Sequence, residues 1–387
     1  MKPRKLGFEL LVATAVAYIV ISYFFGGTRN FENLALGTET SSYNAVDSLG
    51  NAIHIQRTDN QEGQALVKTW KLHGGKPGVL TLGNSQTHSI NQLKSGEVNY
   101  VELLHNMKVF SGYDILSISL PNASIQEMYL AYEDWREILP IHTVIIPVFM
   151  DDFREDGIRD VYFQELIEQK FQIPDSTVRI SQKINQELSS YWLAESESAG
   201  IASTTEVLVD DSRLQDKSER FLNNLLDERS IVWANRPNVR GELFNWLYKL
   251  RNTLLNINAS TTRKVIPQRW DNNMQALKQF TANCAHQRVK VIVYIPPIRW
   301  DAKLPYDEID YRNFKSAVKQ VFEESNAQGV FKNFETIVPA EFWGYKAATN
   351  LRAEREVDYM HFRYEGHQIM RDSLGLALKK VLKLDGI

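Results

Sequence analysis

The chain has 387 residues, 43% of them hydrophobic and 24% charged, which is enough for a domain with a large buried core. Its formal net charge of -3 and the lack of a long basic run exclude binding along a nucleic-acid backbone. The single cysteine, Cys284, excludes internal disulfides and cysteine-rich metal sites, and we expect it to be a small buried hydrophobic residue. The sequence predicts no metal site and no cofactor.

The N-terminus combines a basic start with an apolar run. Lys2, Arg4 and Lys5 precede residues 6–25, about twenty mostly apolar residues that would span the hydrocarbon core as a helix. Cleavage as a signal peptide after Ala17 would leave a bare apolar tail, so we expect an uncleaved anchor over 1–27. The basic residues predict a cytoplasmic N-terminus, which places the rest of the chain on the periplasmic or extracellular side of the cytoplasmic membrane.

The pattern of the next segments predicts a stalk and then a folded domain. Residues 28–76 are polar and weakly patterned, which is typical of a juxtamembrane stalk with some ordered structure near QALVKTWKL, and the domain is expected over 77–387. Apolar runs rich in Val and Ile predict strands at 78–82, 113–120, 142–150 and 289–297. Helices are predicted at 124–139, 271–287, 307–328 and 366–382. Continuous apolar strands that alternate with helices indicate an α/β fold, a three-layer, doubly wound, mostly parallel sheet.

A long connection between the third and fourth strands predicts a helical insertion at about 151–288. Two stretches in it, DVYFQELIEQKF and GELFNWLYKLRNTLLNI, have the apolar spacing of helices. Between them, residues 195–220 are polar and predict a mobile loop.

A serine stands where the first strand should turn into a helix. The stretch GVLTLGNSQTHSINQ, 78–92, places Ser85 after a glycine and an asparagine. Near the other end, VDYMHFRYEGHQIM contains Asp358 and His361, three residues apart before a helical segment. On a loop or a first helical turn, that spacing lets the carboxylate orient the imidazole, and a serine nucleophile needs such a base. The sequence therefore predicts Ser85 as nucleophile, His361 as general base and Asp358 as its orienting group.

These two motifs resemble the SGNH, or GDSL-like, hydrolase superfamily over about 78–382. Gly83-Asn84-Ser85 matches the family's G-D-S block, and Asp358 with His361 matches its final D-x-x-H block. With the predicted anchor, the chain resembles the membrane-tethered branch that includes alginate O-acetylation proteins and the D-alanyl-lipoteichoic acid transfer protein. The resemblance implies an SGNH-like domain that works outside the membrane beside a membrane-bound O-acyltransferase.

The family's two middle blocks are altered in this chain. Leu120-Pro121-Asn122-Ala123-Ser124 stands where the family has a glycine, and Phe149-Met150-Asp151-Asp152 stands in place of G-x-N-D, so the usual oxyanion asparagine is missing. An aspartate such as Asp151 would repel an oxyanion unless it is protonated or turned away. Asn122 is the candidate replacement donor, beside the backbone N–H of Ser85; its alternative role is a cap for the helix near Ser124.

Three further polar residues have a structural and a functional interpretation. His88 follows Ser85 by three residues, and we expect it on a helix surface without a role. Arg154 and Arg159 lie in a charge-rich stretch after a strand. They either form a solvated helix start or hold a carboxylate or phosphate of a surface polymer.

Two function classes remain open. In the first, the chain is a serine esterase or O-acyltransferase that moves an acyl group from an acylated donor to water or to a polysaccharide or cell-wall polymer. In the second, it is a noncatalytic accessory protein that binds the polymer within an acyltransferase complex. The combination of Ser85, His361 and Asp358 favours the enzyme.

Overall fold

The structure is a computed structural model that describes residues 39–57, 60–174, 178–205 and 236–384. The predicted anchor at 1–27 lies outside these ranges. Among the helices within them, none has the length and apolar content needed to cross a membrane. The chain divides into a larger unit and a smaller one. The larger unit contains Glu39–Glu195, Ala259–Lys346 and Val357–Ile387, and the smaller one Met1–Thr38, Ser196–Asn258 and Ala347–Glu356.

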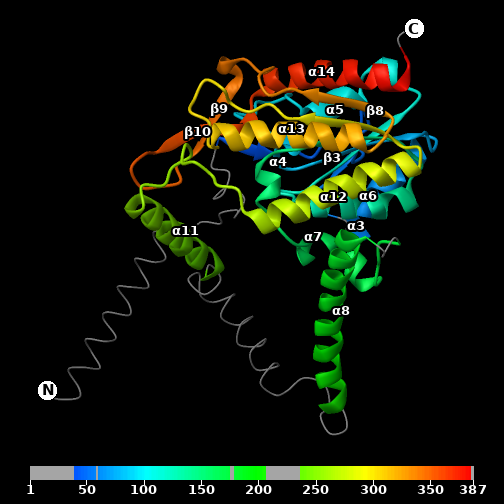
Figure 1. The fold of residues 1–387 in the computed structure, drawn as a ribbon, viewed down its shortest axis with the longest axis horizontal. Coiled ribbons are helices and arrows are strands. Elements are labelled where there is room, and N and C mark those ends of the chain that lie inside the picture. Colours follow the sequence, from blue (N-terminus) through cyan, green and yellow to red (C-terminus); the bar gives the residue numbers. More distant parts are fainter. Residues whose placement is uncertain (1–38, 58–59, 175–177, 206–235, 385–387) are drawn as a thin grey trace, which may run out of the picture. The chain divides into compact units, whose positions relative to one another are not determined.

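A six-stranded parallel sheet forms the centre of the larger unit, in the order β2-β5-β3-β6-β7-β8 (Figure 1). Its strands are β2 (His54–Ile55), β3 (Gly78–Gly83), β5 (Asp114–Ser119), β6 (Ile141–Pro147), β7 (Lys290–Ile295) and β8 (Gly329–Asn333). All residues of β3 and β5 are buried, as expected for strands covered on both faces. The four predicted strands and the parallel sheet are therefore confirmed.

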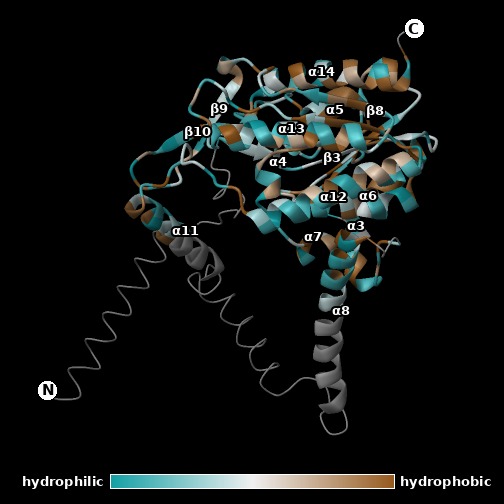
Figure 2. Cartoon of the chain, in the orientation of Figure 1, coloured by the Kyte–Doolittle hydropathy of each residue, from teal (hydrophilic) through white to brown (hydrophobic). Residues whose placement is uncertain are grey.

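Helices cover both faces of this sheet. They include α3 (Asn60–Leu72), α5 (Tyr100–His105), α6 (Ile125–Ile138), α12 (Pro267–His286), α13 (Glu308–Glu324) and α14 (Tyr364–Leu382). Figure 1 shows α5 and α14 together on one side of the strands, and α6 and α12 on the other. In Figure 2 the helices nearest the viewer carry mainly hydrophilic residues, while α13 buries Tyr311, Phe314, Val318 and Val321. The four predicted helices are confirmed to within a few residues at each end.

The chain before β3 is part of the fold, so the predicted stalk over 28–76 is wrong from residue 39 onward. β1 (Thr40–Ser42) pairs antiparallel with β4 (Ser89–Asn91), and β2 adds an edge strand to the sheet beside β5. Ala45, Ile53 and Leu66 are fully buried. Strands of two or three residues are too short to show a periodic pattern, which explains the error.

Only part of the predicted insertion at 151–288 lies outside the α/β core. It contains η2 (Asp151–Phe153), α7 (Asp160–Glu168), α8 (Arg179–Thr205) and α11 (Arg236–Leu254), but α12 belongs to the core, against α6. The predicted loop at 195–220 is helical up to residue 205, as the end of α8, and residues 206–220 lie outside the described ranges. Within the smaller unit, Asn252 Nδ2 donates to the Thr349 carbonyl oxygen over 2.8 Å.

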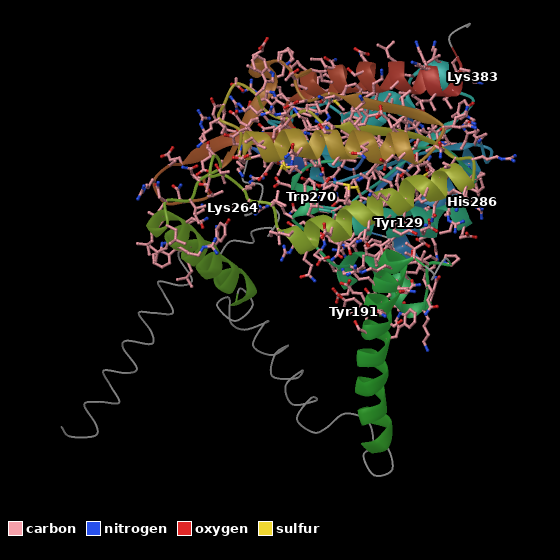
Figure 3. The ribbon with its side chains drawn as sticks, in the orientation of Figure 1. Tyr129, Tyr191, Lys264, Trp270, His286 and Lys383 are labelled. Atoms are coloured by element: carbon pink, nitrogen blue, oxygen red, sulfur yellow. The ribbon has the colours of Figure 1, made fainter. Side chains whose placement is uncertain are left out.

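Polar side chains connect α8 and α12 to the core helix α6. Figure 3 labels Tyr129 on α6, whose hydroxyl lies 3.2 Å from Ser181 Oγ of α8 and accepts from Asn283 Nδ2 of α12 over 3.2 Å. Tyr191 of α8 donates its hydroxyl proton to the Ile158 carbonyl oxygen over 2.8 Å. The first half of α8 is therefore packed on the α/β core by its side chains.

Candidate active site

Ser85 lies at the edge where the parallel strands end, on the turn from β3 into the short helix α4 (Ser85–His88). Asn84 caps this helix: its side-chain oxygen accepts from the Gln86 N–H over 3.1 Å, and its Nδ2 donates to Asp152 Oδ1 over 2.8 Å. Gly83 must be a glycine, since a Cβ there would lie 1.9 Å from Thr87 Oγ1. Close packing and capping thus fix the serine on a tight turn.

Ser85, His361 and Asp358 form a continuous hydrogen-bonded relay. His361 Nε2 lies 3.0 Å from Ser85 Oγ, and His361 Nδ1 lies 2.9 Å from Asp358 Oδ2. Only 6% of Ser85, 7% of His361 and 2% of Asp358 is exposed. The structure therefore brings together the three residues predicted as nucleophile, base and orienting group.

The acid and the base lie on a strand, β10 (Arg355–Phe362), and not on the loop or helical turn expected from the sequence. Asp358 Oδ1 accepts from the backbone N–H groups of Met360 and His361, each over 3.0 Å. These two bonds hold the carboxylate in place, and its Oδ2 reaches His361 Nδ1 on the same strand over 2.9 Å.

Asp358 is held as a carboxylate. Burial alone would raise the pKa of Asp358. The charge and hydrogen bond of His361, the charge of Lys346 and the hydrogen bond from the Met360 N–H together lower this pKa well below its usual range. A negative charge is therefore maintained beside the His361 ring at every physiological pH.

Two residues that the sequence did not identify also contact Asp358. Thr40 Oγ1 of β1 and Asn91 Nδ2 of β4 each donate to Asp358 Oδ2 over 3.3 Å. Asn91 Nδ2 also donates to Thr40 Oγ1 over 3.0 Å and to the Tyr345 carbonyl oxygen over 2.8 Å. A Cβ on Gly344 would lie 1.7 Å from Asn91 Oδ1, so the site depends on the absence of a side chain there. Thr40 stands in the segment predicted as a stalk, where no motif marks it.

Gln86, directly after the nucleophile, connects three segments of the site. Its Nε2 donates to the Met360 carbonyl oxygen over 2.6 Å and to the Pro297 carbonyl oxygen over 2.9 Å. These bonds connect the serine turn to β10 and to the segment after β7. A single glutamine without a spacing pattern gives no sequence signal for such a role.

His88 is fully buried, so its predicted place on a helix surface is wrong. Its Nδ1 lies 2.8 Å from Ser119 Oγ, which is also 2.6 Å from His54 Nε2. The two rings stack with centroids 5.5 Å apart. Burial lowers the pKa of His54 to about 3 and lowers that of His88 well below its usual value, with the neighbouring histidines contributing to the shift of His88. Both rings are therefore neutral and serve as packing and hydrogen-bonding groups.

Asn122 is exposed and lies at the same sheet edge as Ser85. It has a positive φ of 52°, and its carbonyl oxygen accepts from Arg159 Nη2 over 3.3 Å. Within the described ranges, no hydrogen bond joins it to Ser85. The alternative that Asn122 caps the next helix is wrong, because Ser124 caps α6 and forms a capping box with Glu127.

The other predicted oxyanion and substrate residues are engaged by protein groups. Asp151 forms ion pairs with Arg263 and, at 3.7 Å, with Arg154. Arg159 donates from Nε and Nη2 to the Glu127 carboxylate over 2.8 and 2.5 Å, and from Nη1 to the Pro121 carbonyl oxygen over 2.7 Å. Contact of either arginine with an anionic polymer stays a prediction.

Asp152 is the buried partner of the serine turn. Besides Asn84, it accepts from the Phe149 N–H over 2.9 Å. Burial raises the pKa of Asp152 well above its usual value, against the effect of these two hydrogen bonds. The sequence offered Asp152 only as part of an altered motif, and the structure shows that it orients Asn84.

Comparison with known proteins gives only distant likenesses. No family model matches the chain, and no curated protein sequence matches it. Among solved structures, the acetylxylan esterase Axe2 from Geobacillus stearothermophilus aligns with 79% of this chain and 94% of its own, at 11% identity and a TM-score of 0.34. LAE5, an alpha/beta hydrolase enzyme from the metagenome of Lake Arreo, Spain, aligns with 79% of this chain and 96% of its own, at 11% identity and a TM-score of 0.36. Likenesses this weak support no conclusion about the function of this chain.

Proposed function

We propose that the protein is a membrane-anchored, extracytoplasmic serine esterase or O-acyltransferase that acts on acyl groups of a cell-surface polysaccharide or related polymer. The observation that carries this proposal is the relay from Ser85 Oγ through His361 to the Asp358 carboxylate, with contacts of 3.0 and 2.9 Å. This arrangement supplies a nucleophile, a base and a group that fixes the tautomer of the base.

In the first half-reaction, Ser85 Oγ attacks the carbonyl carbon of an acyl ester while its proton passes to His361 Nε2. A tetrahedral intermediate forms, and its collapse breaks the bond to the leaving alcohol. That alcohol takes the proton from Nε2, so the acyl group remains on Ser85 as an ester. Asp358 stays ionised and stabilises the charged imidazole.

In the second half-reaction, a hydroxyl group takes the place of the departed alcohol. It gives its proton to His361 Nε2 and attacks the acyl carbon, and Ser85 Oγ leaves with that proton. Water as the acceptor gives an esterase, and a sugar hydroxyl gives an acyltransferase. The relay serves both outcomes, since exclusion of water and binding of the acceptor decide between them.

The oxyanion of the intermediate needs hydrogen-bond donors near Ser85. As the first residue of α4, Ser85 has a backbone N–H without an intrahelical acceptor, whereas the Gln86 N–H is taken by Asn84. Asn122 is proposed as the second donor because of its position in the sheet. β3 and β5 are neighbours that end at the same edge, with Gly83 opposite Ser119. Ser85 follows β3 and Asn122 follows β5, so both lie at this edge. The ion pairs of Asp151 with Arg263 and Arg154 reduce the repulsion that its carboxylate would exert on an oxyanion.

The polymer substrate and the location rest on the sequence. The predicted anchor at 1–27 would place the relay outside the cytoplasmic membrane, where surface polymers are found. The partners proposed are an acylated donor, a polysaccharide or cell-wall acceptor and a membrane-bound O-acyltransferase.

Acylation of Ser85 provides the direct test. The full chain in an uncharged detergent is incubated with a chromogenic acetyl ester, and mass spectrometry should find an acetyl adduct on the Ser85 peptide. Ser85→Ala should reduce turnover by several orders of magnitude, whereas Ser95→Ala, at an exposed serine, should not. If Ser85→Ala folds normally and still restores polymer acylation in a deletion strain, the protein acts as a noncatalytic accessory.

A further inference from the structure

A pocket lies between α3, α6 and α7 of the larger unit, and none of its lining residues belongs to the relay. Its volume is about 560 Å³, within the range of small-molecule sites. Helix α6 runs from the end of β5, near Ser85, to the start of β6 at the opposite sheet edge. The pocket is lined by the last part of α6, including Asp134, Trp135 and Ile138, so it is separate from the relay.

Asp134 is the unusual residue of this pocket. Its side chain is 8% exposed, and within the described ranges no hydrogen bond or ion pair engages its carboxyl group. A carboxyl group that is mostly buried and has no partner is unfavourable, because it loses part of its hydration and gains no ion pair in return. Burial, helped by the negative charge of Glu165, raises the pKa of Asp134 to about 7. The group is thus available to a cation that enters the pocket.

The other charged residues that line the pocket differ in how far they are exposed to solvent. Glu165, half-buried on α7, accepts from Gln169 Nε2 over 2.8 Å and adds negative charge near Asp134. Lys68 and Lys71 of α3 also line the pocket but are exposed to solvent, and neither forms an ion pair with Asp134. The pocket is therefore acidic inside and basic at its solvent-exposed side.

Apolar side chains also line the pocket. Val67 of α3, Trp135 of α6 and Leu166 of α7 contribute to the lining. Gly63 of α3 lies beside Trp135, since a Cβ built on it would be 3.6 Å from Trp135 Cζ2, an ordinary van der Waals contact. These walls suit a short hydrocarbon chain, because burial of its CH₂ groups is favourable.

We propose that this pocket binds a small zwitterion whose ammonium group pairs with Asp134, whose hydrocarbon portion lies against Trp135 and Leu166, and whose anionic group faces Lys68 and Lys71. A ligand of this kind matches the pocket in charge at both ends. The ammonium supplies the partner that Asp134 lacks, and the anionic end remains near solvent, where desolvation costs less.

The test compares three probes of equal chain length: 6-aminohexanoate, hexylamine and hexanoate. Their dissociation constants are measured by ligand-observed NMR titration of the full chain in an uncharged detergent. We expect 6-aminohexanoate to bind about tenfold more tightly than hexanoate, as expected for one buried ion pair. Equal affinities for these two probes, or no binding of 6-aminohexanoate, would overturn the proposal.

Variants assign the two ends of the ligand. Asp134→Asn should weaken 6-aminohexanoate about tenfold, whereas Glu137→Gln, an exposed carboxylate on the same helix, should leave its affinity unchanged. Lys71→Gln should weaken 6-aminohexanoate but not hexylamine; because this lysine is exposed, the variant should fold even if Asp134→Asn does not. Unchanged affinity for 6-aminohexanoate in both Asp134→Asn and Lys71→Gln would show that the pocket does not bind it as described.

Discussion

Replacing Asp358 by asparagine should disable the proposed base without emptying its site. In the native site, Asp358 Oδ1 accepts two backbone N–H groups and Oδ2 lies 2.9 Å from His361 Nδ1. An asparagine oxygen would retain the two backbone bonds, so its NH₂ group would occupy the place of Oδ2. The NH₂ donates, and His361 must then present a lone pair at Nδ1 and carry its proton on Nε2. Nε2 would donate to Ser85 Oγ and could no longer remove its proton.

The expected loss follows from this change of tautomer. Where an aspartate fixes the tautomer of a catalytic histidine, its replacement by asparagine lowers kcat by about 10⁴, or roughly 5.5 kcal/mol of barrier. The new NH₂ would also face Asn91 Nδ2, which lies 3.3 Å from Oδ2. Two donors facing each other in a buried site should lower the free energy of unfolding by about 1–3 kcal/mol.

The assay measures kcat and KM with a chromogenic acetyl ester, and urea unfolding of the same samples gives the stability. Asp372→Asn serves as the control, because that carboxylate is exposed and pairs with Arg371 at the surface. A folded Asp358→Asn protein that retains more than about a tenth of wild-type kcat would refute the reasoning, since Asp358 would then not fix the tautomer of His361.

Two further predictions concern the support of the site and the stability of the fold. Gly344→Ala should displace Asn91, because its Cβ would lie 1.7 Å from Asn91 Oδ1, and should cost about 1–3 kcal/mol by urea unfolding as well as reducing kcat. Gly112→Ala, where a Cβ meets nothing within 4 Å, is the matched control, and equal effects of the two variants would contradict the argument. His73 lies 2.9 Å from Asp114 and 3.0 Å from Asp47, and although burial opposes the shift, these carboxylates raise its pKa above 6.5. Because the raised pKa belongs to the folded state, this stabilisation is complete below about 6.5 and is lost as pH rises through the folded pKa. The stability difference between wild type and His73→Asn should therefore be larger at about pH 5.5 than at about pH 9; a difference that grows with pH would show that His73 does not bind its proton more tightly in the folded state.

Long apolar runs made the centre of the fold predictable. β3 and β5 are buried throughout and are built around Val, Leu and Ile, although β5 also buries Asp114, Ser117 and Ser119; α13 repeats its buried residues at helical spacing. β8 was missed because its residues are exposed or half-buried, which leaves no apolar run. An apolar run in the sequence therefore marks a strand that is buried on both faces, whereas an exposed strand such as β8 leaves no such run.

The relay was predictable for a different reason. Ser85 stands at a strand-to-helix turn, and Asp358 lies only three residues from His361, so local sequence identifies each part. Thr40 and Asn91 reach Asp358 from 318 and 267 residues away, through side chains found in many proteins without such a role. Contacts of this kind depend on chain folding and leave no local pattern. The position of the relay on a strand was hidden too, because the Asp358 carboxylate is held there by the backbone N–H groups of Met360 and His361.

The position of Thr40 changes how the beginning of the chain relates to the proposed chemistry. A stalk would only hold the domain at a distance from the membrane, but β1 pairs with β4 and places Thr40 opposite Asn91, where both contact the Asp358 carboxylate. β2 then continues into the central sheet beside β5. Residues 40–55, which lie in the segment predicted as a stalk, therefore help to support the relay. A change at Thr40 should therefore affect His361 through Asp358, because residues 39–57 and the proposed site belong to the same compact unit.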